Sequence, residues 1–222
     1  MSDKPVVIFG AGSYAQVANV YLTADGERDV VAFTVHGEYV QSETFSGLPL
    51  VAFEELLADY PPDRVEVLVA IGYQGLNRAR REIYEQCKAQ GYRLVTYVSS
   101  RAMVMTEHPI GENTFVFEAN VIQPFVEIGD NVVLWSGNHI GHHSRVEDHC
   151  FIASHAVVSG HVNIGESCFV GVNATFRDGI SVGPRCVVGA GTVVMADQPE
   201  GTVLAATATP PHPKKSHELR GI

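Results

Sequence analysis

Apolar and polar positions follow two different patterns along the chain, and the first fills roughly its first hundred residues. Short β-branched or apolar runs predict four strands, at Val6–Phe9, Val30–Val35, Val65–Ile71 and Tyr92–Val98. Amphipathic or helix-favouring stretches predict three helices, at about Tyr14–Leu22, Phe53–Leu57 and Asn77–Gln90. Strands that alternate with helices at this spacing predict βαβ units and a parallel sheet. Residues 1–97 are therefore expected to form a small Rossmann-like α/β domain.

From Val98 onward an apolar residue recurs at every sixth position without a slip. The series is Val98, Val104, Ile110, Val116, Ile122, Ile128, Leu134, Ile140, Val146, Ile152, Val158, Ile164, Val170, Phe176, Val182, Val188 and Val194. A period of six fits neither a helix nor a simple strand, but it fits a short strand plus a turn, repeated. Residues 98–199 are therefore predicted to form an all-β parallel β-helix, followed by a tail at 200–222.

The other places of the hexad also repeat. The fifth place is usually small, and Cys150, Cys168 and Cys186 fall there at intervals of 18, so the apolar and the small residues are expected to point inward. Glycine often follows the apolar residue, which would suit a turn with a positive φ. The glycines are Gly111, Gly129, Gly141, Gly165, Gly171, Gly183 and Gly189.

Histidines gather in the middle of the repeat, and four of them occupy the fourth place of consecutive hexads, where they are expected to face solvent: His143, His149, His155 and His161. The spacing of 18 between the three cysteines supports a coil of three hexads, and in such a coil residues 18 apart stack, so His142, Gly160 and Asp178 are expected to share one corner. An imidazole beside a backbone N–H offers a general base and an oxyanion donor, which acyl transfer requires.

Composition narrows the classes of partner. The 222 residues carry a formal charge of −10, and no long apolar stretch or signal peptide is evident. Neither nucleic acid nor a membrane is expected as the main partner. The four cysteines form no CxxC pair, which favours a reduced, cytoplasmic protein.

The whole pattern resembles the sialic-acid O-acetyltransferase and bacillosamine N-acetyltransferase type of sugar acetyltransferase. The stretch Asn138–Ser144 and Ser159-Gly160 one coil later carry the resemblance to the catalytic region. It implies a left-handed β-helix, acetyl-CoA as cosubstrate, a nucleotide-sugar substrate, and a homotrimer with the cofactor groove between subunits. His142 would be the general base and the Gly160 amide would contact the thioester carbonyl.

The same resemblance implies further site residues. In close relatives the residue after the general base is an acid that tunes the base, and here His143 stands in that place. Asp178 or Glu147 could tune His142 instead. Gly171-Val172 and Gly189-Ala190 match backbone that meets the pantetheine arm, and Lys214 of the tail could meet the cofactor phosphates. Relatives often carry another cofactor-contacting histidine where Phe151 stands.

The glycine-rich segment after the first strand is the predicted nucleotide-sugar site. A helix N-terminus that follows such a loop binds phosphate well. Gly10, Gly12, Ser13 and Tyr14 are expected to hold the diphosphate, and by resemblance Gly72, Asn77 and Arg78 form the second nucleotide-contacting loop. The second strand lacks the acid that a dinucleotide site would use on ribose, and His36 stands where relatives often carry one.

Acetyl transfer to an amino group of a nucleotide-linked sugar is the leading hypothesis, and transfer to a sugar hydroxyl is the near alternative. A zinc carbonic anhydrase is disfavoured. The carbonic anhydrases that share this β-helix place two zinc-binding histidines five residues apart, and no two histidines within residues 98–199 have that spacing. No metal is therefore expected. A non-catalytic nucleotide-sugar binder stays open as an alternative.

The aromatic side chains of Trp135, Phe151 and Phe169 are expected to cover one another across the subunits of the trimer.

Overall fold

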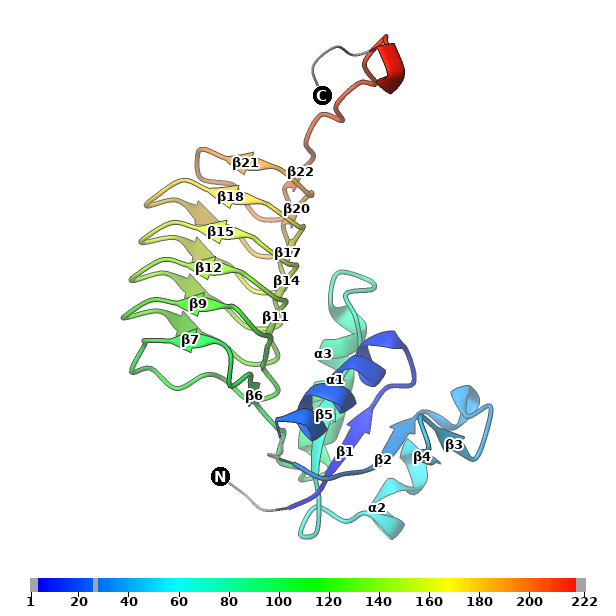
Figure 1. Cartoon of the computed structure of the whole chain (residues 1–222). Coiled ribbons are helices and arrows are strands. Elements are labelled where there is room, and N and C mark those ends of the chain that lie inside the picture. The colour runs from blue at the N-terminus through cyan, green and yellow to red at the C-terminus, as the bar shows by residue number, and fades with distance from the viewer. Residues whose placement is uncertain (1–3, 26–27, 219–222) are drawn as a thin grey trace.

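The computed structural model describes residues 4–25 and 28–218, which form an α/β domain and a β-helix (Figure 1). The α/β domain holds a five-stranded sheet of order β3-β4-β2-β1-β5, in which only β3 runs antiparallel to its neighbour. Its strands are β1 (Val6–Phe9), β2 (Val30–Val35), β3 (Thr44–Phe45), β4 (Leu48–Ala52) and β5 (Glu66–Val69). Its helices are α1 (Ser13–Ala24), α2 (Leu56–Asp59) and α3 (Arg78–Ala89), with 3-10 turns η1 (Gly37–Tyr39) and η2 (Phe53–Glu55).

The predicted strand over residues 92–98 is wrong as a single element. Leu94 makes an isolated parallel bridge to Val67 of the α/β sheet, and Tyr97–Val98 is instead β6, the first strand of the β-helix. The Tyr97 amide donates to the Thr114 carbonyl at 2.9 Å, so this strand already pairs with the next coil. The apolar run is therefore divided between two sheets.

The β-helix winds three two-residue strands per coil, and three parallel sheets form its faces. The sheet β6-β8-β11-β14-β17-β20-β22 will be named face A, the sheet β7-β9-β12-β15-β18-β21 face B, and the sheet β10-β13-β16-β19 face C. Paired residues lie 18 apart, as in Val133 with Phe151 and His139 with Val157, which confirms the predicted coil length.

Face A consists of β6 (Tyr97–Val98), β8 (Phe115–Val116), β11 (Val133–Leu134), β14 (Phe151–Ile152), β17 (Phe169–Val170), β20 (Val187–Val188) and β22 (Val203–Leu204). Face B consists of β7 (Met103–Val104), β9 (Val121–Ile122), β12 (His139–Ile140), β15 (Val157–Val158), β18 (Thr175–Phe176) and β21 (Val193–Val194). Face C consists of β10 (Glu127–Ile128), β13 (Arg145–Val146), β16 (Asn163–Ile164) and β19 (Ser181–Val182). The tail ends in η3 (Ser216–Glu218).

The inward ladders form the core of the β-helix. Apolar residues from Val116 to Val194 at the sixth-residue spacing are buried, whereas Val104 at the open first coil is 37% exposed. The fifth-place cysteines Cys150, Cys168 and Cys186 are buried and free, and their thiols lie within hydrogen-bond distance of carbonyl oxygens one coil further on. Burial raises the pKa of Cys150 well above its ordinary value.

The glycine that follows the apolar residue does not provide a positive φ, so that expectation is wrong. A Cβ built on Gly141 would lie 2.5 Å from the Ser159 carbonyl carbon, and one on Gly171 would lie 2.5 Å from the Ala190 nitrogen. These positions are glycine because consecutive coils approach too closely for a side chain. The left-handed residue is the fourth of the hexad, as at His143 with φ 58° and His161 with φ 58°.

The α/β domain of the same chain covers face A as far as β17, whereas Val203 of β22 is 70% exposed. This cover corrects the expectation that Trp135, Phe151 and Phe169 meet across subunits. The Tyr73 ring lies 5.0 Å from the Phe151 ring and 4.7 Å from the Phe169 ring, and the Tyr14 ring lies 6.0 Å from Trp135. Apolar residues of both domains share one buried cluster. The two domains are therefore joined by a continuous core.

A buried arginine on α3 ties the domains together. Arg80 is 0% exposed; its Nε donates to Asn131 Oδ1 at 3.2 Å and its Nη1 donates to Asn77 Oδ1 at 3.2 Å. Its Nη2 donates to the carbonyl oxygens of Asn131, His149 and Cys150 at 2.9 to 3.1 Å. Burial lowers the pKa of Arg80 to about 10, so the guanidinium keeps its charge at neutral pH.

We expect Arg80→Met to lower the free energy of unfolding by about 3 to 5 kcal/mol, because several buried oxygens lose their only cationic donor. The control is Arg78→Met on the same helix, whose side chain is 78% exposed and should matter by less than about 0.5 kcal/mol. Denaturant unfolding measures both. Equal effects of the two substitutions would contradict a structural role for Arg80.

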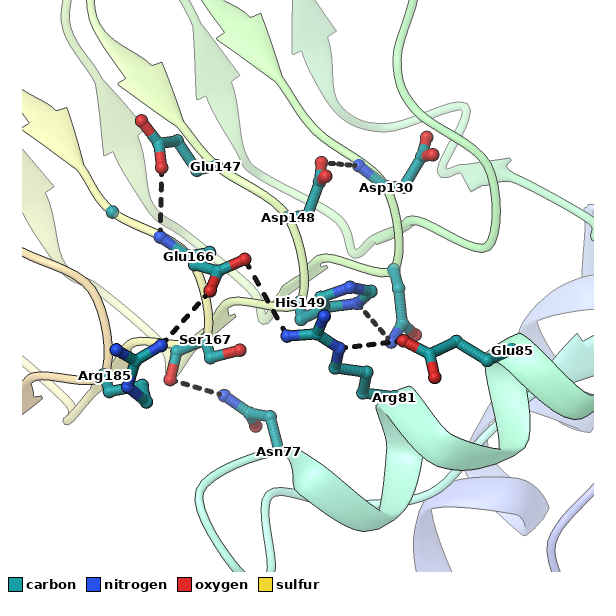
Figure 2. A network of polar contacts seen from close by, with 12 residues as sticks. Asn77, Arg81, Glu85, Asp130, Glu147, Asp148, His149, Glu166, Ser167 and Arg185 are labelled. Carbon is teal, nitrogen blue, oxygen red and sulfur yellow. Dashed lines mark hydrogen bonds and ion pairs between the residues drawn. The ribbon is translucent and has the colours of Figure 1, made fainter.

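His149 belongs to the same joint and is not the surface group that its hexad place predicted. It is 7% exposed, its ring packs 5.5 Å from the Tyr84 ring, and its Nδ1 lies 3.0 Å from Asn131 Nδ2. Figure 2 shows it between Asp148 and Arg81, where α3 meets the corner of the β-helix. Burial lowers the pKa of His149, and the nearby Arg81 adds to this.

Acid is expected to weaken the joint through His149. Its folded pKa lies below an unfolded value of about 6.5, so the unfolded state binds more protons in the window just below that pH. This contribution to stability is complete above pH ~6.5 and is lost as pH falls through the folded pKa. Unfolding measured between pH 7 and pH 5 should show a steeper loss for the wild type than for His149→Asn, which keeps the left-handed backbone.

The control for this pH series is His155→Asn, because His155 has a similar φ of 60° but is exposed. That variant should follow the wild-type slope. Parallel slopes for the wild type and His149→Asn would contradict the assignment.

No helix in the described part of the chain is both long and apolar enough to cross a bilayer.

Candidate functional site

The predicted stack of His142 and Gly160 exists at one corner of the β-helix, between face B and face C. His142 lies between β12 and β13, and Gly160 lies one coil further on, between β15 and β16. A Cβ built on Gly160 would lie 2.6 Å from His142 Cε1 and 2.8 Å from His142 Nε2. The exposed imidazole therefore rests its Cε1–Nε2 edge against the glycine, where any side chain would displace it.

The amide of Gly160 is free within the described residues, whereas several amides at the same hexad place are capped by side chains. Asp130 N–H donates to Asp148 Oδ1 at 2.8 Å, and His142 N–H donates to Gln123 Oε1 at 2.9 Å. No such acceptor stands below Gly160 in the part of the chain that the structure describes. An uncapped N–H beside an imidazole can donate to a developing oxyanion.

His142 is paired with its neighbour in sequence. Its Nδ1 lies 3.1 Å from His143 Nδ1, so one ring donates and the other accepts. If His142 donates, its Nε2, which lies beside Gly160, keeps a lone pair, and this is the tautomer that a general base needs. The His143 ring in turn stacks on His161 at 4.8 Å and packs 4.6 Å from Phe125.

Of the two carboxylates considered as partners of the base, the structure places one at this corner. Asp178 Oδ1 lies 3.0 Å from a Cβ built on Gly160, one coil beyond it. Glu147 lies on the corner between faces C and A, where its carboxylate accepts from the Glu166 amide at 3.2 Å. Asp178 is therefore the carboxylate near the corner of His142 and Gly160.

The predicted cofactor residues lie at a different corner of the same chain. Gly171-Val172 and Gly189-Ala190 follow β17 and β20, so they occupy the corner between faces A and B. They stack on one another at the 18-residue spacing, but from Gly160 to Gly171 the chain passes another corner. One chain does not bring them beside His142. Lys214 is exposed in the tail, and its amide donates to His212 Nδ1 at 3.1 Å.

The predicted phosphate loop lines a cleft of about 840 Å³ in the α/β domain. Gly10, Gly12, Ser13, Tyr14 and Gly72 all line it. β1 lies between β2 and β5, so the chain adds β2 and β4 on one side of β1 and β5 on the other side. The carboxyl ends of β1 and β5 open into the cleft. Such a switch point is where open α/β sheets bind ligands.

Gly10 is required by the close approach of the two strand ends. Its φ is +140°, and a Cβ would lie 2.7 Å from the Ala70 carbonyl oxygen. Gly12 precedes α1 in an extended conformation, with nothing within 4 Å of a Cβ. The first-turn amides of α1 therefore face an open cleft, which favours an anion.

The cleft also contains His36, at the position where relatives often carry an acid. It stands at the end of β2, and its Nδ1 lies 2.8 Å from the Glu54 carboxylate. Hydrogen bonds lower the pKa of Glu54, first from its own backbone amide, then from His36 and from the Gly37 amide. The sequence did not single out several other residues that line the cleft. Among them are Gln74 and, at helical spacing on α3, Ala79, Glu82, Ile83 and Gln86. That spacing on α3 is the signal that could have found them.

The predicted second nucleotide loop is only partly in the cleft. Asn77 is 0% exposed, and its amide donates to the Ser167 and Cys168 carbonyls at 3.4 and 3.1 Å (Figure 2). Its side chain thus holds the two domains together. Arg78 is exposed and lies 3.7 Å from Glu82, outside the cleft lining.

Three family models match the chain. The model described as PglD N-terminal domain matches residues 5–87. The bacterial transferase hexapeptide model (six repeats) matches residues 126–160, and the hexapeptide repeat of succinyl-transferase matches residues 161–196. A search of curated protein sequences gave no significant match.

Solved structures match over the length of both domains. PerB from Caulobacter crescentus, in complex with CoA and GDP-perosamine, is 28% identical over 91% of this chain and 94% of its own, with a TM-score of 0.80. The acetyltransferase domain of PglB from Neisseria gonorrhoeae, in complex with acetyl coenzyme A, is 26% identical over 91% and 96%, with a TM-score of 0.80. WeeI from Acinetobacter baumannii, at 18% identity over 90% and 95% and a TM-score of 0.79, shares the fold.

Proposed function

We infer, from its membership of the hexapeptide-repeat sugar acetyltransferases, that this chain transfers acetyl from acetyl-CoA to an amino group of a nucleotide-linked sugar. The single observation that carries the chemistry is the His142 imidazole lying against the uncapped Gly160 amide. Transfer to nitrogen is favoured over oxygen because one relative is named a perosamine N-acetyltransferase.

The transfer proceeds by direct attack. The acceptor amine nitrogen forms a bond to the thioester carbonyl carbon while His142 Nε2 takes a proton from it. The oxyanion of the tetrahedral intermediate accepts a hydrogen bond from the Gly160 N–H. Collapse breaks the carbon–sulfur bond, and the imidazolium returns its proton to the CoA thiolate. Cys150, Cys168 and Cys186 are buried in the core, so none is placed to form an acyl-thiol intermediate.

The nucleotide sugar binds in the cleft of the α/β domain. Its diphosphate lies at the N-terminus of α1, near Gly10, Gly12 and Ser13, where the first-turn amides of α1 and the helix dipole favour negative charge. His36 supplies a polar edge for the base or ribose. PerB, which binds GDP-perosamine, shares this architecture, and it supports a nucleoside-diphosphate amino sugar as substrate.

We expect Gly12→Asp to raise KM for the nucleotide sugar about tenfold while leaving the fold intact. Gly12 is the N-cap of α1, so aspartate there stabilises the helix, whereas its charge repels the diphosphate. Gly12→Asn is the matched control because it has the same shape without the charge. Steady-state kinetics and thermal unfolding measure the two effects, and equal KM values for the two variants would contradict the phosphate assignment.

We propose a homotrimer in which neighbouring subunits complete the site. The corner of His142 and Gly160 lies between faces B and C. The predicted cofactor residues Gly171-Val172 and Gly189-Ala190 lie between faces A and B. In a trimer with threefold symmetry, the corner of His142 in one chain faces the corner of Gly171-Val172 in the next chain. Face B also carries exposed Val157 and Val193, which an interface would cover. Light scattering showing a stable monomer would contradict the shared site.

The experiment that tests the function is a thiol-release assay with acetyl-CoA against UDP-, GDP- and dTDP-linked amino sugars. At least one amino sugar should release CoA, and its hydroxyl analogue should not. Release with the hydroxyl analogue alone would indicate an O-acetyltransferase. Binding of nucleotide sugars without release by any of them would indicate a non-catalytic binder and contradict the proposal.

A further inference from the structure

We propose that His142, His143 and His161 bind a divalent transition-metal ion of the zinc class, and that this ion blocks the acetyl transfer proposed above. The inhibition rests on the proposed function, whereas the binding site does not. The three side chains come from two consecutive coils of one corner, and a ligand nitrogen of each lies within 4.8 Å of the others. No other such group of three histidine, cysteine or carboxylate side chains occurs among the described residues.

The geometry suits a tetrahedral ion. Two imidazole nitrogens on zinc, at bonds of about 2.0 to 2.1 Å, are about 3.3 Å apart. His142 Nδ1 and His143 Nδ1 are already 3.1 Å apart. The His161 ring lies 4.8 Å from His143 and 5.1 Å from His142, centroid to centroid, so a small shift of an exposed side chain brings the third nitrogen into range.

Exposure of all three rings favours reversible binding. Each is exposed at the corner, so the fourth position of the ion is open to water. The backbone places two of the side chains at equivalent left-handed positions, since His143 and His161 both have φ 58°. Their rings stack nearly parallel at 14°, so binding requires one exposed ring to rotate until its in-plane lone pair points at the shared ion.

Occupancy of the site removes the base by fixing its tautomer. A neutral imidazole has one nitrogen with a lone pair and one that carries the proton. When the metal takes the lone pair of His142 Nδ1, the proton must reside on Nε2, the nitrogen that lies against Gly160. His142 then has no lone pair to accept the proton of the acceptor amine, so the metal-bound enzyme is inactive.

Calorimetric titration of the metal-stripped full chain with ZnCl₂, in the absence of acetyl-CoA, tests the site. The wild type should bind zinc at this site, and His161→Asn should weaken binding at least tenfold. His155→Asn is the matched control, because His155 occupies the same place of its hexad with φ 60° but lies outside the cluster. Equal affinity of the wild type and His161→Asn, or no binding by the wild type, would overturn the proposal.

The inhibition is tested by measuring the acetylated sugar by mass spectrometry while zinc is titrated, because the CoA thiol itself binds zinc. Each variant is compared with its own metal-free rate. The wild type and His155→Asn should lose activity and regain it with a chelator, and His161→Asn should need at least tenfold more zinc. Equal sensitivity of all three would overturn the inhibition. A chain that binds zinc through His161 but transfers no acetyl group would support the site and refute only the proposed function.

Discussion

Replacing His142 by alanine is expected to lower kcat/KM for acetyl transfer about a thousandfold. General-base catalysis by a positioned side chain contributes roughly 10²- to 10⁴-fold, and His142 is the imidazole whose Nε2 edge lies against Gly160. Because the side chain is exposed at a corner, its removal leaves the core of the β-helix unchanged. The loss should appear in kcat, with KM for acetyl-CoA little altered.

His108→Ala is the control for this substitution. His108 is also an exposed histidine of the β-helix, but it lies between β7 and β8, in the first coil. It should keep most of the activity. A His142→Ala enzyme that retains more than about a tenth of the wild-type kcat would remove His142 from the role of base, because general-base catalysis is worth at least about a hundredfold.

Gly160→Ala is expected to lower kcat by about a hundredfold or more. The new Cβ would lie 2.6 Å from His142 Cε1, so the imidazole must move away from the amide. The oxyanion donor and the base would then no longer face the same carbonyl, and loss of one such donor costs about 10²- to 10³-fold.

The backbone itself should tolerate the added methyl group of Gly160→Ala. Val172 and Ala190 occupy the same hexad place at another corner and carry side chains, so this place of the β-helix accepts a Cβ. Thermal unfolding of Gly160→Ala should therefore match that of the wild type. A variant of normal stability and normal kcat would show that the contact between Gly160 and His142 is unimportant for the reaction.

The repeat made most of the β-helix predictable. An uninterrupted period of six fixes which residues point inward, and the coil of three hexads that the resemblance implies then fixes which corner residues stack. His142, Gly160 and Asp178 could thus be placed together before the structure, and the structure confirms that they are. The reason for the glycines was not predictable, because the distance between coils is not encoded in the period.

The joint between the domains could not be predicted from local patterns. Arg80 stands on a polar helix and Asn77 directly precedes it, and nothing in their spacing shows that another domain buries them. Their donors bind carbonyl oxygens of turns some 50 to 90 residues away in sequence, which only the tertiary fold brings near. For the same reason His149 resembles its exposed neighbours in sequence but is buried in the structure.

The cofactor residues show a limit of the resemblance. Gly171-Val172 and Gly189-Ala190 are correctly expected to stack on one another, but their corner is not that of His142. A repeat places residues within one chain and says nothing of a second chain. Whether the two corners meet depends on assembly, which the single-chain pattern does not contain.

The most direct measurement of the central claim is a crystal structure of the chain with CoA and the nucleotide amino sugar found in the assay. The acceptor nitrogen should lie within hydrogen-bond distance, about 2.6 to 3.2 Å, of His142 Nε2. The sulfur of CoA should lie beside the Gly160 amide. An acceptor bound at another corner, with His142 facing only solvent, would contradict the claim.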